Sequence, residues 1–258
     1  MKTAVGPPLG GVLYSFGRFL PFLTDAISYA VSVFSLSFIK TKFQVERVAA
    51  LRKLRVEIVE GMKWLWQQPL LRSMAFLNSG MSSLCAGLAL IIIVLAQQQH
   101  VSATFIGIIF GAGGATSTLG ALVAPLLQKR LSYGQAIIGL WWLYGLMWAL
   151  FVIAFTPILL GAFVAIFFLV DSIYNIVQFS YRLALIPDEL QGRINSAFHL
   201  ISYSLRPLGL ALTGLCIQFI GAVPTTVVVS IGLFLLAVAA TVNPHIRKAP
   251  PLHEIRDT

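Results

Sequence analysis

Long apolar runs separated by short polar connections dominate the chain. A run of roughly 20 apolar residues is long enough for a helix to cross the hydrocarbon core of a bilayer. A first span is expected at Leu20–Ile39, and the apolar run before it, Ala4–Phe16, is too short to cross. Further spans are expected at Leu70–Ala96, Thr104–Leu127, Tyr133–Phe155, Ile158–Leu183, Ile194–Ile220 and Val223–Val242. The pattern therefore predicts a packed bundle of membrane-spanning helices joined by short turns.

The longest polar connection, residues 40–69, has a pattern of its own. Apolar residues recur in it at three- and four-residue spacing, at Leu51, Leu54, Ile58, Met62 and Leu65. This spacing is typical of an amphipathic helix, and the neighbouring Trp64 and Trp66 favour a helix that lies on the membrane surface. A solvated linker with a single helical turn is the alternative.

Composition sets the class of protein. Hydrophobic residues make up 58% of the 258 residues, charged residues make up 10%, and the mean hydropathy is +0.87. Soluble domains carry about a quarter charged residues, so the chain falls outside that class. The apolar runs are continuous rather than alternating, which excludes a membrane β-barrel. The expected fold class is all-α, a polytopic membrane helical bundle.

The charges indicate which side of the membrane each connection faces. The formal net charge of +9 comes from Lys and Arg that gather in alternate connections and in the C-terminal tail. Because basic connections stay in the cytoplasm, we expect a multi-pass protein of the plasma membrane with a cytoplasmic C-terminus. No basic face with stacking aromatic residues is present, so the lipid bilayer is an expected partner and nucleic acid is not.

The sequence carries no signature of metal, cofactor or enzyme chemistry. Cys85 and Cys216 both lie inside apolar runs and indicate neither a disulfide nor a metal site. No His-Glu-x-x-His, no nucleophile–base set and no pair of membrane aspartates occurs. We therefore expect no metal, no cofactor and no enzymatic activity.

Two charges lie deep in consecutive apolar spans. Asp171 lies near the middle of one expected helix and Arg206 near the middle of the next, which runs antiparallel to it. A charge at this depth is expensive, so it usually faces a partner or a water-filled cavity. We expect the two to face a central cavity as a breakable pair, with Asp171 as a candidate site for a proton or a cationic substrate. A static structural pair, or two side chains that snorkel to the surface, is the alternative.

A polar stripe accompanies the acid. Tyr174, Asn175 and Gln178 follow Asp171 at spacings of three, four and seven residues, so the four share one face of a helix. Such a stripe on an apolar helix normally points into the bundle, and we expect this face to contact a substrate. Asn78, in another span, is a further candidate for the cavity wall.

Several short motifs together resemble those of a known family. They are Gly6-Pro7-Pro8-Leu9-Gly10-Gly11, the segments 20–29 and 60–64, Pro69-Leu70-Leu71-Arg72 and the segment 186–196. In this order and spacing the chain resembles the major facilitator superfamily, and within it the branch of enterobactin exporters and macrolide-efflux permeases, which are drug–proton antiporters. The first motif is similar to the glycine–proline motif of the fifth helix of these antiporters.

The resemblance implies a domain organisation. Family members have twelve helices in two six-helix halves. Residues 1–39 would be a remnant of the N-terminal half, with the end of the fifth helix and the sixth. Residues 40–69 would be the cytoplasmic linker, 70–244 the C-terminal six-helix half and 245–258 a cytoplasmic tail. We thus expect an N-terminally truncated transporter that does not transport by itself.

The resemblance also implies an inner gate. The gate residues would lie in the loop between the tenth and eleventh helices of the family, at Arg182, Pro187, Asp188, Glu189, Gly192 and Arg193. Pro187 and Gly192 would set the turn. Ordinary positive-inside topology is the alternative for the basic residues, and it alone would account for Arg182.

Small residues are the candidates for close helix packing. In the fifth-helix motif they are Gly6, Pro7, Gly10 and Gly11, and Gly107 and Gly111 form a Gly-x-x-x-Gly pair in a later span.

The function implied by the resemblance is secondary transport. We expect proton-coupled efflux of amphipathic small molecules such as drugs or siderophores, with the small molecule and protons as partners. A non-transporting membrane assembly or interaction protein, or an inactive fragment, is the alternative.

Overall fold

Helices account for nearly all of the chain that is described. The computed structural model describes residues 13, 17, 19–38, 54–187 and 190–251. The elements are α2 (Leu20–Ser37), α3 (Leu54–Gln67), α4 (Pro69–Leu84), the 3-10 helix η1 (Cys85–Gly87), α5 (Leu88–Gln98), α6 (Ala103–Arg130), α7 (Tyr133–Val152), α8 (Pro157–Leu185), α9 (Gln191–Ser204), α10 (Arg206–Ile220), α11 (Ala222–Val242) and α12 (Pro244–Arg247). No strand occurs among these residues, and the predicted all-α class is confirmed.

The membrane spans lie close to the expected ranges, with one difference. Seven stretches of the described residues are long and apolar enough to cross a membrane. The difference is that Pro69–Gln98 and Gln191–Ile220 are not continuous helices but are interrupted, the first at η1 and the second at Leu205. Pro207 explains the second break, because its ring removes a backbone donor that a continuous helix needs.

Hydroxyl caps start the helices after the short connections. The side chains of Ser102 and Thr156 accept hydrogen bonds from the backbone N–H groups of Phe105 and Leu159, each at 3.3 Å. Ser132 and Gln135 form a reciprocal capping box at the start of α7. Each cap satisfies a backbone donor that a helix start leaves without a partner. Connections of a few residues can therefore reverse the chain.

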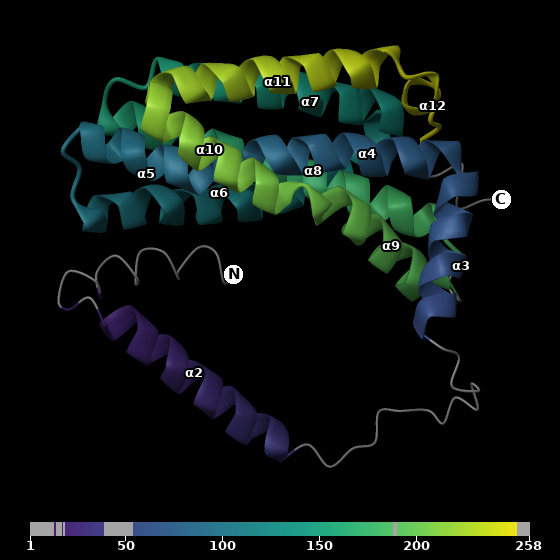
Figure 1. Ribbon diagram of the computed structural model, residues 1–258, viewed down its shortest axis with the longest axis horizontal. Helices are drawn as coiled ribbons and strands as arrows, with labels where there is room; N and C mark the ends of the chain where they lie inside the picture. Colours follow the sequence, from purple (N-terminus) through teal and green to yellow (C-terminus); the bar gives the residue numbers. More distant parts are fainter. Residues whose placement is uncertain (1–12, 14–16, 18, 39–53, 188–189, 252–258) are drawn as a thin grey trace.

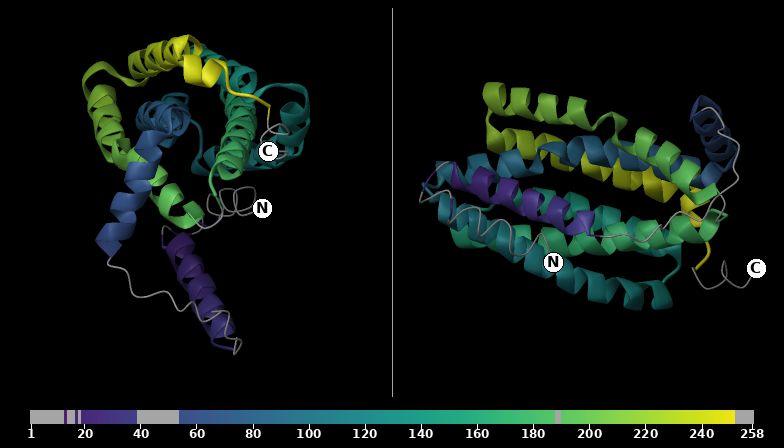
Figure 2. Two further views of the ribbon diagram at one scale, coloured as in Figure 1. Left: turned by 90° about the vertical axis from the view of Figure 1, so that its right-hand side faces the viewer. Right: turned by 90° about the horizontal axis from the view of Figure 1, so that it is seen from below.

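The spans from α4 to α11 lie side by side as one bundle (Figures 1 and 2). Helix α8 packs closely against α6 and α7, and α7 packs against α11. The ends of α6 and α8, the starts of α7 and α9, and α12 all lie at one end of the bundle, on the right in Figure 1. The basic residues Lys129, Arg130, Arg193, Arg247 and Lys248 belong to these element ends. The alternating connections predicted to be basic thus meet at one end.

Helix α3 crosses that end of the bundle at a steep angle to the spans (Figure 1). It packs on α9 and α4, and Leu65 is fully buried. Glu60 accepts a hydrogen bond from Nη1 of Arg193 at 3.1 Å, forming an ion pair between α3 and α9. The expected helix exists, but it is docked on the bundle by its apolar side.

Helix α2 differs from the others because it stands apart from the bundle in Figure 1 and in the left view of Figure 2. None of its residues is buried, and its large apolar side chains, such as Phe22 and Phe34, are exposed. In a bilayer those side chains would contact lipid.

Glycines bring α6 close to α8. A Cβ atom at Gly113 would lie 2.8 Å from the ring of Phe168, and one at Gly120 would lie 2.5 Å from the backbone oxygen of Leu169. Gly107 and Gly111 are also buried on α6. The other packing candidates, Gly6, Pro7, Gly10 and Gly11, lie outside the described residues.

A second glycine contact joins the two interrupted spans. A Cβ atom at Gly209 in α10 would overlap the backbone oxygen of Ser83 in α4, and one at Gly87 in η1 would overlap the side chain of Thr213. Each break therefore lies against the other span with no room for a side chain.

We predict that Gly209→Ala destabilises the protein by about 1–3 kcal/mol, because the added methyl group forces the α4 backbone to move. Gly139→Ala on α7 is the matched control, since a Cβ there meets nothing within 4 Å. Thermal unfolding of the purified protein in detergent checks both. Equal melting temperatures for the two variants would contradict the close contact.

Candidate functional site

Asp171 lies near the middle of α8, and two neighbours hold its carboxylate. The hydroxyl of Tyr144 on α7 donates a hydrogen bond to Oδ1 at 2.5 Å. Nδ2 of Asn175, one turn later on α8, donates to Oδ2 at 3.0 Å and to the Asp171 backbone oxygen at 2.8 Å. Hydrogen bonds to an ionised acceptor are stronger than those between neutral groups. The arrangement fixes the direction in which the carboxylate points.

A second polar contact links α8 to α4. The hydroxyl of Tyr174 donates to Oδ1 of Asn78 at 3.0 Å. The Tyr174 ring is buried and packs edge-on against the ring of Tyr144, with centroids 5.5 Å apart. Tyr144 and Tyr174 therefore join three helices next to Asp171.

Asp171 lines a pocket of about 260 Å³. Its wall comes from α4, η1, α5, α7, α8, α9 and α10, and consists of Asn78, Met81, Ser82, Cys85, Leu88, Tyr144, Phe167, Phe168, Asp171, Tyr174, Asn175, Tyr203 and Arg206. We call it the Asp171 pocket. The wall combines aromatic and apolar side chains with five polar or charged ones, so the pocket can contact both the apolar and the polar parts of a small molecule.

Arg206 faces the same pocket but does not form the expected ion pair with Asp171. Among the described residues its contact is with the ring of Tyr203, whose centroid lies 5.9 Å from the guanidinium carbon. The described polar contacts of Asp171 are with Tyr144 and Asn175. The break at Leu205 explains the difference, because it makes Arg206 the exposed first residue of α10 and not a mid-helix residue. The structure brings the two charges to one pocket without joining them.

A second pocket, of about 320 Å³, adjoins the first. It is lined by Asn78, Asn175, Ile176, Gln178, Phe179, Ser180, Arg182, His199 and Tyr203. We call it the Arg182 pocket. Asn78, Asn175 and Tyr203 line both. The predicted stripe on α8 thus divides between them, with Asp171 and Tyr174 on the first, Gln178 on the second and Asn175 on both.

The four described residues of the expected inner gate lie in different places. Arg182 lies inside the last turn of α8 and is buried, not in the connecting loop. Pro187 follows α8, but Gly192 lies within α9 instead of shaping the turn, and its φ is not positive. Arg193 pairs with Glu60 of α3. Asp188 and Glu189 lie outside the described residues.

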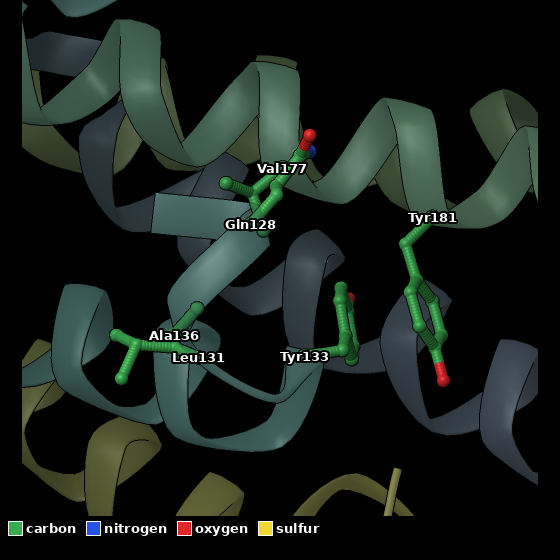
Figure 3. Close-up of a pocket in the computed structure, with 6 residues that line it drawn as sticks. All are labelled: Gln128, Leu131, Tyr133, Ala136, Val177 and Tyr181. Carbon is green, nitrogen blue, oxygen red and sulfur yellow. The ribbon is translucent and has the colours of Figure 1, made fainter. Parts of the chain in front are cut away.

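A third, much smaller space lies where α6, α7 and α8 meet (Figure 3). Its volume is about 10 Å³, which is room for about one water molecule. The rings of Tyr133 and Tyr181 stack beside it with centroids 3.8 Å apart. It is a joint between helices and too small for a substrate.

Tyr144 is a residue of the candidate site that the sequence did not reveal. It lies in an apolar helix without charged residues, and nothing in the local pattern marks it. The available signal was indirect, because a buried tyrosine hydroxyl usually finds a hydrogen-bond partner and Asp171 is the acid of the next helix. Within the described residues no cluster of three or more His, Cys, Asp or Glu side chains could hold a metal ion.

Residues 2–210 match the family model described as the Major Facilitator Superfamily. The chain belongs to this superfamily. It is a family of transporters, which confirms that the chain is not an enzyme and that it is a multi-pass membrane protein.

The chain is also similar to the multidrug efflux pump Tap of Mycolicibacterium fortuitum. The two are 26% identical over 257 residues, a match that covers 95% of this chain and 60% of the pump. The chain thus spans about 60% of the length of that relative. The motifs predicted a member of the superfamily that resembles efflux transporters, and this match confirms the prediction.

We predict that Tyr174 and Asn78 are energetically coupled. A double-mutant cycle of Tyr174→Phe and Asn78→Ala should give about 0.6–1.7 kcal/mol, the range for hydrogen bonds between membrane helices. The measurement is thermal unfolding of the two single variants and the double variant. Tyr203→Phe, on a half-exposed ring, is the control and should change stability little. Additive effects of Tyr174→Phe and Asn78→Ala would contradict the contact.

Proposed function

We propose that the chain serves in a proton-coupled secondary transporter that exports amphipathic small molecules, the class to which drugs and siderophores belong. The observation that carries this proposal is the carboxylate of Asp171, held in the middle of an apolar helix and facing a pocket. An ionisable group at this depth marks a substrate or ion pathway in membrane proteins. The likeness to a protein named as a multidrug efflux pump supports export.

The Asp171 carboxylate has no fixed cationic partner among the described residues. It can therefore hold either a proton or a cationic group of a substrate, but not both at once. Two ligands that exclude each other at one group are coupled, and the coupling is reciprocal. Arrival of a proton releases the substrate cation, and arrival of the cation releases the proton.

The rest of the Asp171 pocket suits the apolar part of such a molecule. Phe167 and Phe168 of α8 and Tyr144 of α7 form an aromatic wall on the same pocket. Flat aromatic surfaces bind many apolar shapes and also attract cations through their faces. We therefore assign cationic amphipathic molecules to this pocket.

The proposal includes an orientation in the membrane. The gathering of basic element ends at one end of the bundle supports a plasma membrane location with that end in the cytoplasm. Helix α12, the last element that the structure describes, lies at the same end.

We predict that a green fluorescent protein fused after the last residue is fluorescent in cells, because that protein matures in the cytoplasm. Alkaline phosphatase fused at the same position should be inactive, because it needs the outer side. Active phosphatase with a dark fluorescent fusion would reverse the orientation.

We predict that Asp171→Asn, introduced into the native gene, lowers efflux of the cationic dye rhodamine 123 about tenfold or more. The amide cannot exchange a proton for a cation, and a lost charge-assisted contact is worth about 1.5–3 kcal/mol. Dye efflux from energised cells, with and without a protonophore, measures the effect.

Asp25→Asn is the matched control for this experiment. Asp25 is also a carboxylate in an apolar helix, but it is exposed on α2 and lines neither pocket. Its substitution should leave dye efflux near the native rate. An Asp171→Asn variant with native efflux and an unchanged pH dependence would disprove the coupling role.

A further inference from the structure

Arg182 is a buried cation that the proposed function does not use. Its side chain is 2% exposed, whereas the side chain of Arg193 at the same end of the bundle is 30% exposed. Burying a guanidinium away from water is costly unless acceptors replace the water. The cost of burying Arg182 therefore depends on the contacts of its guanidinium.

Two aromatic rings account for the faces of the guanidinium. Its central carbon lies 4.1 Å from the ring centroid of Phe198 on α9 and 5.4 Å from that of Phe179 on α8. Such contacts stabilise the charge through the planar faces. They leave the N–H groups, which point outward in the plane, without acceptors.

One of those N–H groups has no acceptor among the described residues. Nε of Arg182 has no hydrogen-bond partner there, and no carboxylate of the described residues forms an ion pair with the guanidinium. Gln178, one turn earlier on α8, is 7% exposed, and its Nε2 has no hydrogen-bond partner either. Two buried side chains, each with one nitrogen that lacks a hydrogen-bond partner among the described residues, thus line the same pocket.

The geometry points to a ligand with a two-oxygen acidic group. A guanidinium presents its donors as a planar fork that matches a carboxylate, and the amide of Gln178 adds donors beside it. The pocket volume of about 320 Å³ leaves room for such a group and part of the molecule that carries it. His199, Ser180 and Asn175 add polar atoms to the wall.

The position of the pocket links it to the Asp171 pocket. Asn78, Asn175 and Tyr203 line both, so one molecule can extend from one into the other. Asp171 and Arg182 are separated by roughly 16 Å along the axis of α8. The stem of Arg182 shortens this separation, because its guanidinium lies over Phe179, three residues toward Asp171.

We propose that the Arg182 pocket binds the carboxylate of the transported molecule, and that the preferred substrates are zwitterionic amphipathic molecules with a basic group at Asp171. This inference rests on the proposed transport function but assigns a different site and a different group. The two can fail separately.

Two dyes that differ in one group test it. Rhodamine 110 carries a cationic ring system and a free carboxylate, and rhodamine 123 is its methyl ester. Fluorescence anisotropy measures binding of each to the purified full chain in nanodiscs of phosphatidylcholine, a lipid without net charge. We expect the native protein to bind the acid more tightly than the ester.

Arg182→Gln should weaken binding of the acid about tenfold and leave that of the ester within about twofold, because only the acid loses a charge-assisted contact. Arg193→Gln is the matched control, since Arg193 lies outside both pockets, and it should change neither affinity. Arg182→Lys keeps the charge without the fork and should retain part of the preference. Unchanged binding of the ester shows that a variant is folded.

The outcomes separate the two proposals. Asp171→Asn should weaken both dyes, and a native affinity of that variant for both would contradict the cation site alone. Equal affinities of the native protein for acid and ester would disprove the Arg182 site alone. An Arg182→Gln variant that binds the acid with native affinity would also disprove the Arg182 site. The same holds if anionic phosphatidylglycerol in the discs lowers the affinity for the acid as much as Arg182→Gln does.

Discussion

The cost of charge in an apolar surrounding governs the arrangement of this bundle. A carboxylate or a guanidinium inside a membrane must find hydrogen-bond partners or a polar cavity. Asp171 finds both, with donors from Tyr144 and Asn175 and an open pocket beside them. Arg182 finds two aromatic rings and a second pocket. The polar interior of the bundle consists of the two pockets in which Asp171 and Arg182 find these surroundings.

The interrupted spans supply the walls of that interior. A continuous helix satisfies its own backbone and offers only side chains, whereas a break also sets new directions for the residues that flank it. The break at η1 brings Cys85 to the Asp171 pocket, and the break at Leu205 does the same for Arg206. Both breaks therefore contribute a residue to the pocket that Asp171 lines. The wall of the Asp171 pocket thus combines the flanks of two helix breaks with regular helices such as α7 and α8.

Much of the fold could be predicted from the sequence, because in a bilayer the length of an apolar run and the helical spacing of its polar residues determine where a span lies and which face is polar. The spans follow from apolar runs, and the face of α8 that carries Asp171, Tyr174 and Gln178 follows from helical spacing. What could not be predicted depends on contacts between helices. Tyr144 is one apolar-helix residue among many until α8 packs against it.

Arg182 shows the same limit. Its position near the end of a span favours a residue that reaches toward the polar boundary, and topology alone would account for it. The ring of Phe198, supplied by the next helix, instead draws the guanidinium inward. The docking of α3 on α9 is similar, because amphipathic spacing predicts the helix but not the surface that receives it.

The two glycine contacts between the interrupted spans have a mechanical consequence. Gly87 lies against Thr213 and Gly209 against Ser83, so neither backbone has slack where the other bends. Straightening one span would drive it into its neighbour unless the neighbour straightened too. The two interrupted spans must therefore move together. A change in the shape of the Asp171 pocket where these spans form its wall is a concerted movement of both.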